Sequence, residues 1–316
     1  MSSNTLPVVR ASELDVQPQE QRWLIDGLWA RSAIGLIGGA PKCCKTWFGL
    51  DMAVSVASGT PALGHFACKA PGPALVYLAE DALPQVRSRI EALCRSRGRD
   101  IGSLDLHVIT VPVLRLDLGG DQERLARTIE ELRPRLVLLD PLVRLHRLDE
   151  NSAADISGLL GYIRDLQRRF DVAIVLVHHA SKKQRSQPGQ ALRGSSDLHA
   201  IGDCNAYLAR DGKHIALTIE HRAARSPEPM LLELVTDSSA EAAYLRVVSP
   251  TAPHALQPTV GEQILELLAR ATQPLTRAAL RSALRINNLR LGDALERLER
   301  SGHVERTPRG WVLRLI

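Results

Sequence analysis

The sequence predicts an α/β protein: a parallel sheet with helices on both faces, antiparallel strands added at its C-terminal side, and a small winged helix-turn-helix domain. Short apolar runs alternate with amphipathic stretches of helical period from about residue 33 to 180. Strict alternation of strand and helix is typical of parallel sheets covered on both faces. Near the C-terminus, three short helical patterns precede two strand patterns, which is the order of a winged helix.

The composition is that of a globular protein. The chain has 316 residues, 45% of them hydrophobic and 24% charged, which excludes extensive disorder and suggests two domains. No uncharged apolar run reaches about 18 residues, and the first twenty residues lack the apolar stretch of a secretory signal. Five cysteines without a C-x-x-C pair predict a cytoplasmic location rather than a disulfide scaffold or zinc site. The net charge of +5 permits a nucleic-acid partner without requiring one.

The strands of the parallel sheet are predicted from short apolar runs, at residues 33–37, 74–79, 104–109, 136–139 and 172–177. Apolar residues at helical spacing predict helices between them, at residues 83–93, 125–132 and 156–170. Pro134 ends the second of these helices, and Ser152 with Asp155 resembles a capping box at the start of the third.

Beyond residue 200 the pattern changes to consecutive strands, predicted as antiparallel additions at residues 204–209, 214–220, 230–235 and 243–248. A proline-rich stretch, SPTAPHALQP, is interpreted as a linker. Helices are then expected at 263–271, 276–284 and 287–300, and strands at 303–306 and 310–316. The predicted organisation is an N-terminal tail (1–20), an α/β domain (21–248), a linker (249–260) and a winged-helix-like domain (261–316).

A phosphate-binding loop is predicted where the first strand runs directly into a helix. Gly39, Lys45 and Thr46 match the pattern G-x-x-x-x-G-K-T, but Cys44 stands where the pattern has glycine. Backbone N–H groups and a helix N-terminus would receive the anion, and the lysine would contact the β and γ phosphates. The alternative is a glycine-rich turn with an incidental Lys-Thr pair. The predicted nucleotide-binding residues are Gly39, Ala40, Pro41, Lys42, Cys43, Cys44, Lys45, Thr46 and Trp47.

Polar residues follow three other predicted strands. Asp140 ends an apolar strand, as a magnesium-holding carboxylate does in ATPases, and Glu80 stands where a base could orient the attacking water. His178 and His179 end a further strand, where a polar group can sense the γ-phosphate. Each has a plainer alternative, such as a capping aspartate or a charge at a helix N-terminus. Ligands of open α/β sheets bind at the carboxyl ends of strands, where all these residues are expected.

Taken together, the chain resembles the RecA-like ATPases, and most closely the RepA group of plasmid replicative helicases (the AAA_25 family). The resemblance covers roughly residues 21–248. It rests on five segments: Gly-Gly-Ala-Pro-Lys-Cys-Cys-Lys-Thr-Trp at 38–47, Tyr-Leu-Ala-Glu-Asp at 77–81, Leu-Leu-Asp-Pro-Leu at 138–142, Val-His-His at 177–179 and Arg-Gly-Ser-Ser at 193–196. Each segment alone is weakly specific, and the combination is fairly specific.

The resemblance implies an ATP- and Mg²⁺-dependent motor or switch, commonly a hexameric ring, acting on DNA. It implies that Lys45 and Thr46 hold phosphates and Mg²⁺, that Asp140 holds Mg²⁺ through water, and that Glu80 is the catalytic base. Ring members also insert an arginine from a late strand into the neighbouring site, and Arg222 is the best match. The expected lysine two residues earlier is replaced by glutamate. The departure at Cys44 bears on hydrolysis more than on nucleotide binding.

Two regions are candidates for DNA contact. In the RecA-like plan, the basic stretch 181–190, with Lys182, Lys183 and Arg185, faces the pore of the ring and would contact single-stranded DNA. A solvated surface loop is the alternative. Residues 261–316 hold ten arginines and six acids, and Arg290 and Arg297 project from the expected recognition helix among acidic neighbours. This mixed face leaves DNA binding and partner docking both open.

Two functions therefore follow from the sequence. The first is an oligomeric, ATP-dependent DNA helicase of a plasmid or other mobile element, with ATP hydrolysed between subunits. The second is a nucleotide-switched DNA-binding regulator or helicase loader with little or no turnover.

Overall fold

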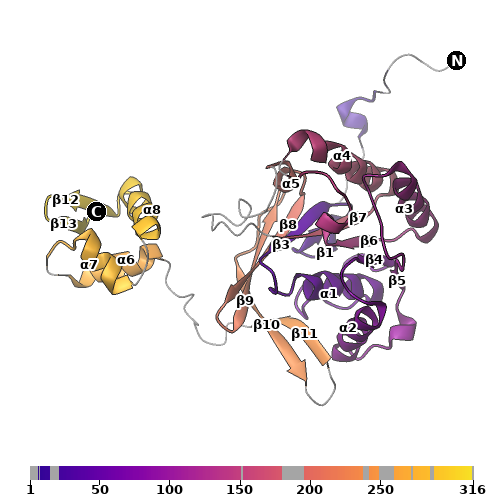
Figure 1. Ribbon diagram of the computed structural model, residues 1–316, viewed down its shortest axis with the longest axis horizontal. Coiled ribbons are helices and arrows are strands. Elements are labelled where there is room, and N and C mark those ends of the chain that lie inside the picture. Colours follow the sequence, from indigo (N-terminus) through magenta and orange to yellow (C-terminus); the bar gives the residue numbers. More distant parts are fainter. Residues whose placement is uncertain are drawn as a thin grey trace. The chain divides into compact units, whose positions relative to one another are not determined.

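The computed structural model describes residues 6, 8–14, 21–150, 152–179, 196–237, 242–248, 260–271, 273–284 and 288–314. The chain forms two compact units, Met1–Val248 and Ser249–Ile316. Figure 1 shows a helix-covered sheet in the first unit, and helices with a hairpin in the second. None of the helices in these described ranges combines the length and apolarity that a membrane span requires.

A nine-stranded sheet forms the centre of the first unit, in the order β11-β10-β9-β8-β3-β7-β6-β4-β5. The six strands from β8 to β5 are mutually parallel, and β9, β10 and β11 are antiparallel. The strands are β3 (Ile34–Gly39), β4 (Ala74–Leu78), β5 (Leu106–Val108), β6 (Leu136–Asp140), β7 (Ala173–His179), β8 (Cys204–Asp211), β9 (His214–His221), β10 (Met230–Asp237) and β11 (Ala242–Val247).

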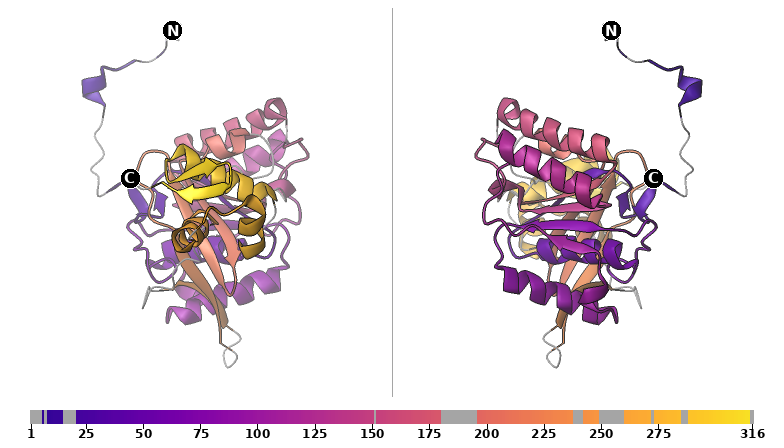
Figure 2. Two further views of the ribbon diagram at one scale, coloured as in Figure 1. Left: turned by 90° about the vertical axis from the view of Figure 1, so that its left-hand side faces the viewer. Right: turned by 90° about the vertical axis from the view of Figure 1, so that its right-hand side faces the viewer.

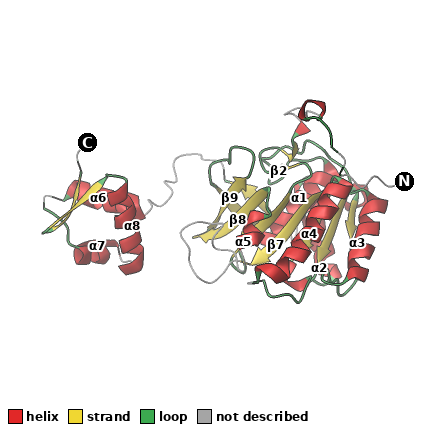
Figure 3. Ribbon diagram, turned by 90° about the horizontal axis from the view of Figure 1, so that it is seen from above, coloured by secondary structure: helices red, strands yellow, loops and turns green. Residues whose placement is uncertain are grey.

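Helices cover both faces of this sheet. One face packs against α1 (Lys45–Ser58) and α2 (Leu83–Ser96), and the other against α3 (Gly119–Leu132) and α4 (Ala153–Phe170). Figure 2 shows the sheet between these two layers, and Figure 3 shows α3 and α4 lying across the strands. Alternate side chains of each strand enter the two cores, so the central parallel strands β3, β4, β6 and β7 are apolar up to their carboxyl ends. This arrangement confirms the predicted fold class.

Local signals explain where the helices start and stop. Ser152 caps α4 by accepting a hydrogen bond from the Asp155 amide at 3.3 Å, as its sequence pattern predicts. Arg133, immediately before Pro134, adopts a left-handed conformation that ends α3 at Leu132. The described part of the first unit also contains four short helices, η1 (Ala11–Glu13), η3 (Ile101–Ser103), η4 (Leu142–Arg144) and α5 (Ser196–Ala200).

The direction of one strand differs from the expectation. β8 was expected to be antiparallel, like the three strands that follow it, but it pairs in parallel with β3, with Ile37 opposite Ala206. The reason is the connection from β7 to β8, which spans residues 180–203 and includes α5. It is long enough to return the chain to the amino edge of the sheet, where a strand parallel to β7 has to begin. The carboxyl end of β8 therefore lies beside that of β3.

A short hairpin before β3 has no counterpart in the sequence analysis. β1 (Trp23–Ile25) and β2 (Trp29–Ala30) pair around a turn in which Gly27 has a φ of 66°. Trp29 is fully buried, and its ring N–H donates to the Ala33 carbonyl at 3.3 Å. Strands of three and two residues are too short for periodicity to show them.

Within its described residues, the second unit contains three helices and a two-stranded antiparallel hairpin, in the order expected from the sequence. Its core contains Ile264, Leu280, Leu291 and Leu295, together with Trp311 from the hairpin. The winged-helix assignment stays a prediction, and the expected linker lies almost entirely outside the described residues. The elements are α6 (Val260–Arg270), α7 (Arg277–Leu284), α8 (Asn288–Arg300), β12 (Val304–Thr307) and β13 (Gly310–Leu313).

A buried ion pair ties α1 to the end of α2. Arg97 Nη2 lies 2.5 Å from Asp51 Oδ2, and the two side chains are 9% and 1% exposed. The other carboxylate oxygen of Asp51 accepts the Leu63 amide at 2.7 Å. Removal of one member of such a pair leaves a buried charge without compensation.

We therefore expect Asp51→Ala to lower the free energy of unfolding by roughly 3 kcal/mol, because Arg97 loses its counter-ion in the protein interior. Glu123→Ala is the matched control, since it removes an exposed glutamate–arginine pair on α3 and should change stability by less than about 0.5 kcal/mol. Urea denaturation of both variants measures the difference. Equal effects would contradict the structural role given to Asp51.

Candidate functional site

The loop between β3 and α1 lies at the carboxyl edge of the parallel strands. β3 is flanked by β7 and β8, so the ends of three parallel strands meet there. Gly39, the last residue of β3, has no room for a side chain, because a Cβ would lie 2.4 Å from the Leu208 carbonyl oxygen and 2.6 Å from Cys43 Sγ. The close approach of β8 thus requires the first glycine of the pattern.

Lys45 is folded onto this loop. Its Nζ donates to the carbonyl oxygens of Gly39 at 3.0 Å and Ala40 at 2.8 Å, and the side chain is almost fully buried. The first N–H groups of α1 have no carbonyl partner within the helix, so they are available to an anion. A buried ammonium group beside a helix N-terminus makes this loop strongly attractive to phosphate.

Cys44, which replaces the glycine of the pattern, keeps the left-handed backbone conformation that a glycine would have there. Cys44 caps α1 with a φ of 65°, a region that disfavours residues with a Cβ, and Lys42 has a φ of 63°. Cys43 is fully buried, whereas Cys44 is half-buried. Burial raises the pKa of both thiols above the usual value, against the opposing charges of Lys45 and Arg210. Both thiols are therefore protonated at neutral pH.

Asp140 ends β6 on the same face as α1. Burial raises its pKa to about 6, while a hydrogen bond from Thr46 opposes the shift and the nearby charge of Asp81 adds to it. Within the described ranges, Asp140 Oδ2 is buried without a hydrogen-bond partner. This oxygen is costly to leave unsatisfied, and a cation bound beside it would remove the cost.

The donors at this edge suit magnesium. A hydroxyl from Thr46 and a carboxylate from Asp140 are hard oxygen ligands, and Mg²⁺ in nucleotide sites takes one or two protein oxygens with phosphates and water as the remainder. In the described part of the chain, no group of three or more His, Cys, Asp or Glu residues forms a metal site. The edge therefore fits a cation that arrives with a phosphate ligand.

Two acidic residues follow β4 near the loop, and both are paired with arginines. Glu80 Oε1 lies 2.8 Å from Arg144 Nε of η4, with the two side chains 45% and 63% exposed. Asp81 pairs with Arg89 of α2, whose guanidinium in turn lies over the ring of Trp47. The carboxylate expected to act as a base is thus bound to a neighbouring cation of the same chain.

The two histidines at the end of β7 lie on opposite faces of the sheet. Val175 and Val177 face the core that contains α1, so strand alternation directs His179 to the phosphate-loop side. His178 faces the other core, where its Nδ1 lies 3.8 Å from Glu150 Oε1. Only His179 therefore lies on the face from which a γ-phosphate could be sensed.

Arg222 is separated from the loop of its own chain. It follows β9, whose end pairs with Cys204 at the start of β8, so Arg222 lies at the amino edge of the parallel strands. Phosphates bound at the Gly39 loop of the same chain lie at the opposite edge. Arg222 and the loop at Gly39 therefore do not meet within one chain.

Arg210 was missed by the sequence analysis. Its Nη2 donates to the Lys42 carbonyl at 3.2 Å from the end of β8, which places an exposed cation beside the phosphate loop. The parallel direction of β8 is the signal that would have identified it, because only a parallel neighbour of β3 ends at this edge. Arg144, the partner of Glu80, likewise carries no sequence signal of its own.

Lys182, Lys183 and Arg185 lie outside the described residues, and the side chains of Arg290 and Arg297 in α8 are also not described.

With the geometry established, comparison with protein families identifies the chain. Residues 2–185 match the AAA_25 family of AAA domains. The protein belongs to this family. The match contains β3, the phosphate loop, Glu80, Asp140 and both histidines, but it ends before β8, β9 and Arg222. The comparison with curated proteins finds no match.

Solved structures share the fold of this AAA_25 member. One is described as an ATPase domain, with 15% identity and a TM-score of 0.52, covering 68% of this chain and 86% of that one. Another is a DnaB-like replicative helicase studied for its interactions with primase, with 17% identity and a TM-score of 0.52, covering 68% of this chain. The chain spans 57% of that helicase's length.

The left-handed backbone at Cys44 leads to a stability prediction. Cys44→Gly should raise the free energy of unfolding by about 1 kcal/mol, because glycine adopts a φ of 65° without the steric cost of a Cβ. Denaturation without nucleotide measures the change. Arg133→Gly is a matched control with a φ of 46° at an exposed position outside the site, and it should give a similar gain. Destabilisation by Cys44→Gly alone would show that the thiol supports the loop.

The burial of Asp140 leads to a pH prediction. Folding raises the pKa of Asp140 from 3.8 to about 6, because the charged carboxylate is disfavoured in the folded state. The free energy of unfolding therefore falls as pH rises from about 4 to 6, where the side chain loses its proton. Asp140→Asn should therefore stabilise the nucleotide-free protein by roughly 2–3 kcal/mol at pH 8, and the gain should shrink towards pH 4. Asp171→Asn, at an exposed position, should show no such gain. A pH-independent difference would contradict this assignment.

Proposed function

We propose that this protein is an ATP-hydrolysing, oligomeric DNA motor of the RepA helicase type, which serves replication or maintenance of a plasmid or other mobile element in the cytoplasm. The observation that carries the proposal is the convergence of Lys45, Thr46 and Asp140 at the end of β3 and β6, in a chain of the AAA_25 family. The likeness in fold to an ATPase domain and to a replicative helicase supports it.

In the proposed site, ATP lies with its phosphates on the loop that follows Gly39. Lys45 exchanges its contacts with the carbonyls of Gly39 and Ala40 for the β- and γ-phosphate oxygens. Thr46 and Asp140 would hold Mg²⁺, which when bound neutralises charge that develops on the phosphates. Binding of the cation also explains why a carboxylate with an unpartnered oxygen is retained in a buried position.

Hydrolysis requires a water molecule in line with the γ-phosphate, and Glu80 is the proposed base that orients it. Its ion pair with Arg144 is exposed on both sides, so it costs little to break when nucleotide and a neighbouring subunit arrive. His179 is the proposed sensor of the γ-phosphate, and Arg222 the proposed cation supplied by the adjacent subunit. A ring, in the family a hexamer, would bring Arg222 to that site.

DNA is the proposed substrate of the motor. The basic segment with Lys182, Lys183 and Arg185 directly follows β7, so a change sensed by His179 would reach it along one strand. Single-stranded DNA in the pore is the proposed partner of this segment. The second unit, with Arg290 and Arg297, is proposed to bind DNA or to dock a replication partner.

A nucleotide-switched regulator or helicase loader is the second candidate. Two features favour it: Glu80 is paired with Arg144, and Cys44 stands at the tightest bend of the loop. Both allow nucleotide to bind, but neither promotes attack of water on the γ-phosphate. The two functions differ in how many ATP molecules one subunit consumes.

Steady-state ATP hydrolysis distinguishes them. Each wild-type subunit should turn over many ATP molecules, and Glu80→Gln should reduce kcat at least about 100-fold while it leaves nucleotide binding intact. Glu91→Gln is the matched control, because it also removes a glutamate paired with an exposed arginine, and it should have wild-type activity. Lys45→Ala should abolish nucleotide binding. Binding without turnover in the wild type would support the switch.

Strand separation tests the motor itself. Wild-type protein with ATP and Mg²⁺ should unwind a forked duplex, and Glu80→Gln should not. Binding of ATP and DNA with hydrolysis but no translocation would show that the helicase assignment is wrong.

A further inference from the structure

Asp203 is fixed to the sheet at the amino edge of β3. Its backbone N–H donates to the Ile34 carbonyl at 2.7 Å, and its Oδ2 accepts the Ile34 amide at 3.1 Å. Its carbonyl also accepts the backbone N–H of Arg222 at 2.9 Å. Asp203 and Arg222 therefore lie opposite each other, one residue beyond the paired residues of β8 and β9. Contacts with backbone groups alone already fix the position of the Asp203 carboxylate.

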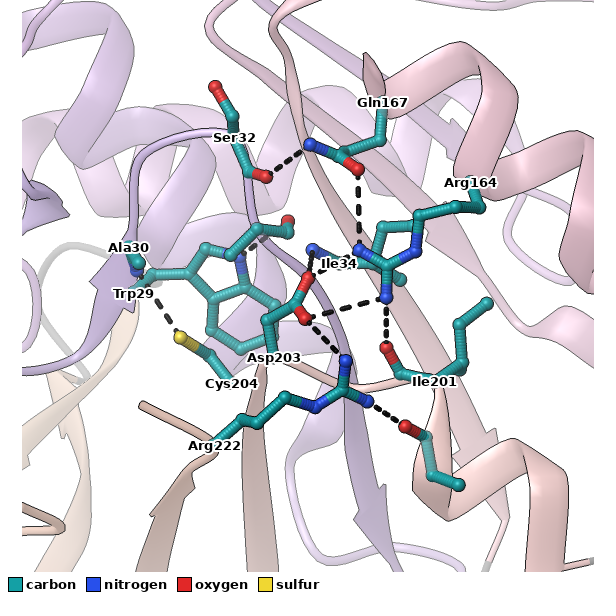
Figure 4. A network of polar contacts seen from close by, with 12 residues as sticks. Trp29, Ala30, Ser32, Ile34, Arg164, Gln167, Ile201, Asp203, Cys204 and Arg222 are labelled. Carbon is teal, nitrogen blue, oxygen red and sulfur yellow. Dashed lines mark hydrogen bonds and ion pairs between the residues drawn. The ribbon is translucent and has the colours of Figure 1, made fainter. Parts of the chain in front are cut away.

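Two guanidinium groups share this carboxylate. Arg164 Nη1 of α4 lies 2.7 Å from Asp203 Oδ2, and Arg222 Nη1 lies 3.1 Å from Oδ1 (Figure 4). Arg164 also donates to the Ile201 carbonyl at 2.6 Å. The Arg164 and Asp203 side chains are mostly covered, at 21% and 25% exposure, whereas Arg222 is 51% exposed.

The charges of this cluster do not cancel. One carboxylate faces two arginines: Oδ2 accepts from Arg164 and the Ile34 amide, whereas Arg222 lies nearest to Oδ1. Arg222 is the outer cation, and its remaining Nη2 donates to the Ala200 carbonyl at the end of α5. A surface pocket beside it is also lined by Arg22 and Arg31. This edge therefore has an excess of positive charge, with the exposed guanidinium of Arg222 available to an anion from outside the chain.

We infer that Asp203 is a positioning residue for Arg222, and that Arg164 neutralises Asp203 so that Arg222 keeps one nitrogen on the carboxylate and presents the other to a phosphate of the neighbouring subunit. This inference rests on the proposed function, since it requires nucleotide at a subunit interface. The contact with Ala200 is the one exchanged for phosphate. Ordering of a long side chain before assembly reduces the entropy cost at the moment of reaction.

The test begins with hydrolysis by the assembled wild type, Asp203→Asn and Arg222→Ala. The asparagine side chain would keep an oxygen for the Ile34 amide and lose the charge that orients Arg222. We expect kcat to fall roughly 10- to 100-fold with KM for ATP unchanged, and to fall further in Arg222→Ala. Asp171→Asn is the matched control, because it removes an exposed aspartate beside Arg31 at the same edge, and it should retain wild-type kcat.

Mixed assemblies then separate an effect on the neighbour from an effect on the subunit's own fold. Lys45→Ala subunits have no working phosphate loop but carry intact Asp203 and Arg222. Assembled together with Asp203→Asn subunits, they should restore hydrolysis well above the sum of the two separate activities, because the intact arginine now serves the intact loop. Thermal unfolding and sedimentation of each variant confirm that folding and assembly are retained.

The outcomes are distinguishable. If Lys45→Ala restores Arg222→Ala but not Asp203→Asn, or if Asp203→Asn has wild-type kcat, the positioning role is overturned and the proposed function stands. If Lys45→Ala fails to restore Arg222→Ala, the proposed arginine in trans is wrong, and the role of Asp203 is rejected with it. A wild type without turnover rejects the ATPase proposal itself.

Discussion

Parallel pairing of β3 with β7 on one side and β8 on the other is the constraint on which the rest of the structure depends. It brings the carboxyl ends of strands from distant parts of the sequence to one edge, together with the N-terminus of α1. It also requires glycine at residue 39, where the β8 backbone approaches. The same pairing sends the end of β9 to the opposite edge, so the chain separates its phosphate loop from Arg222. A site that used both would have to combine two subunits.

The phosphate loop shows that conformation, rather than residue type, is what its tightest bend requires. Cys44 adopts a left-handed backbone that glycine would adopt without strain, and its neighbour Cys43 is buried against the loop. The cost is of the order of 1 kcal/mol, which is small beside the stability of a domain of this size. Both thiols remain protonated because burial outweighs the adjacent cations. The loop with cysteine therefore keeps the backbone conformation that glycine would give, at a small cost in stability.

Pairing within the chain occupies most of the ionic groups that the proposed chemistry uses. Lys45 is bound to loop carbonyls, Glu80 to Arg144, and Arg222 to Asp203. The Glu80–Arg144 pair is exposed on both sides and contributes little to stability, so it can exchange partners when a ligand or subunit arrives. The Arg222–Asp203 pair is more covered, because the Asp203 side chain is 25% exposed. The buried Asp140 differs, because one of its oxygens has no hydrogen-bond partner among the described residues. A proton or a bound cation would offset the cost of burying this charge. The chain thus holds its ionic groups close to where nucleotide chemistry needs them.

The sequence by itself determined the fold class, the order of strands and helices, and the residues at the strand ends, because apolar periodicity and the glycine-lysine-threonine pattern are local properties. Element boundaries followed closely for the same reason. The direction of β8 was decided only in three dimensions, since one residue pattern serves parallel and antiparallel pairing alike. So were the opposite orientations of His178 and His179, and the contacts of Arg210, Arg144 and Asp203 with their partners. Those partners lie 39 to 168 residues away in several cases, and no local signal specifies which distant residues the packed sheet brings together.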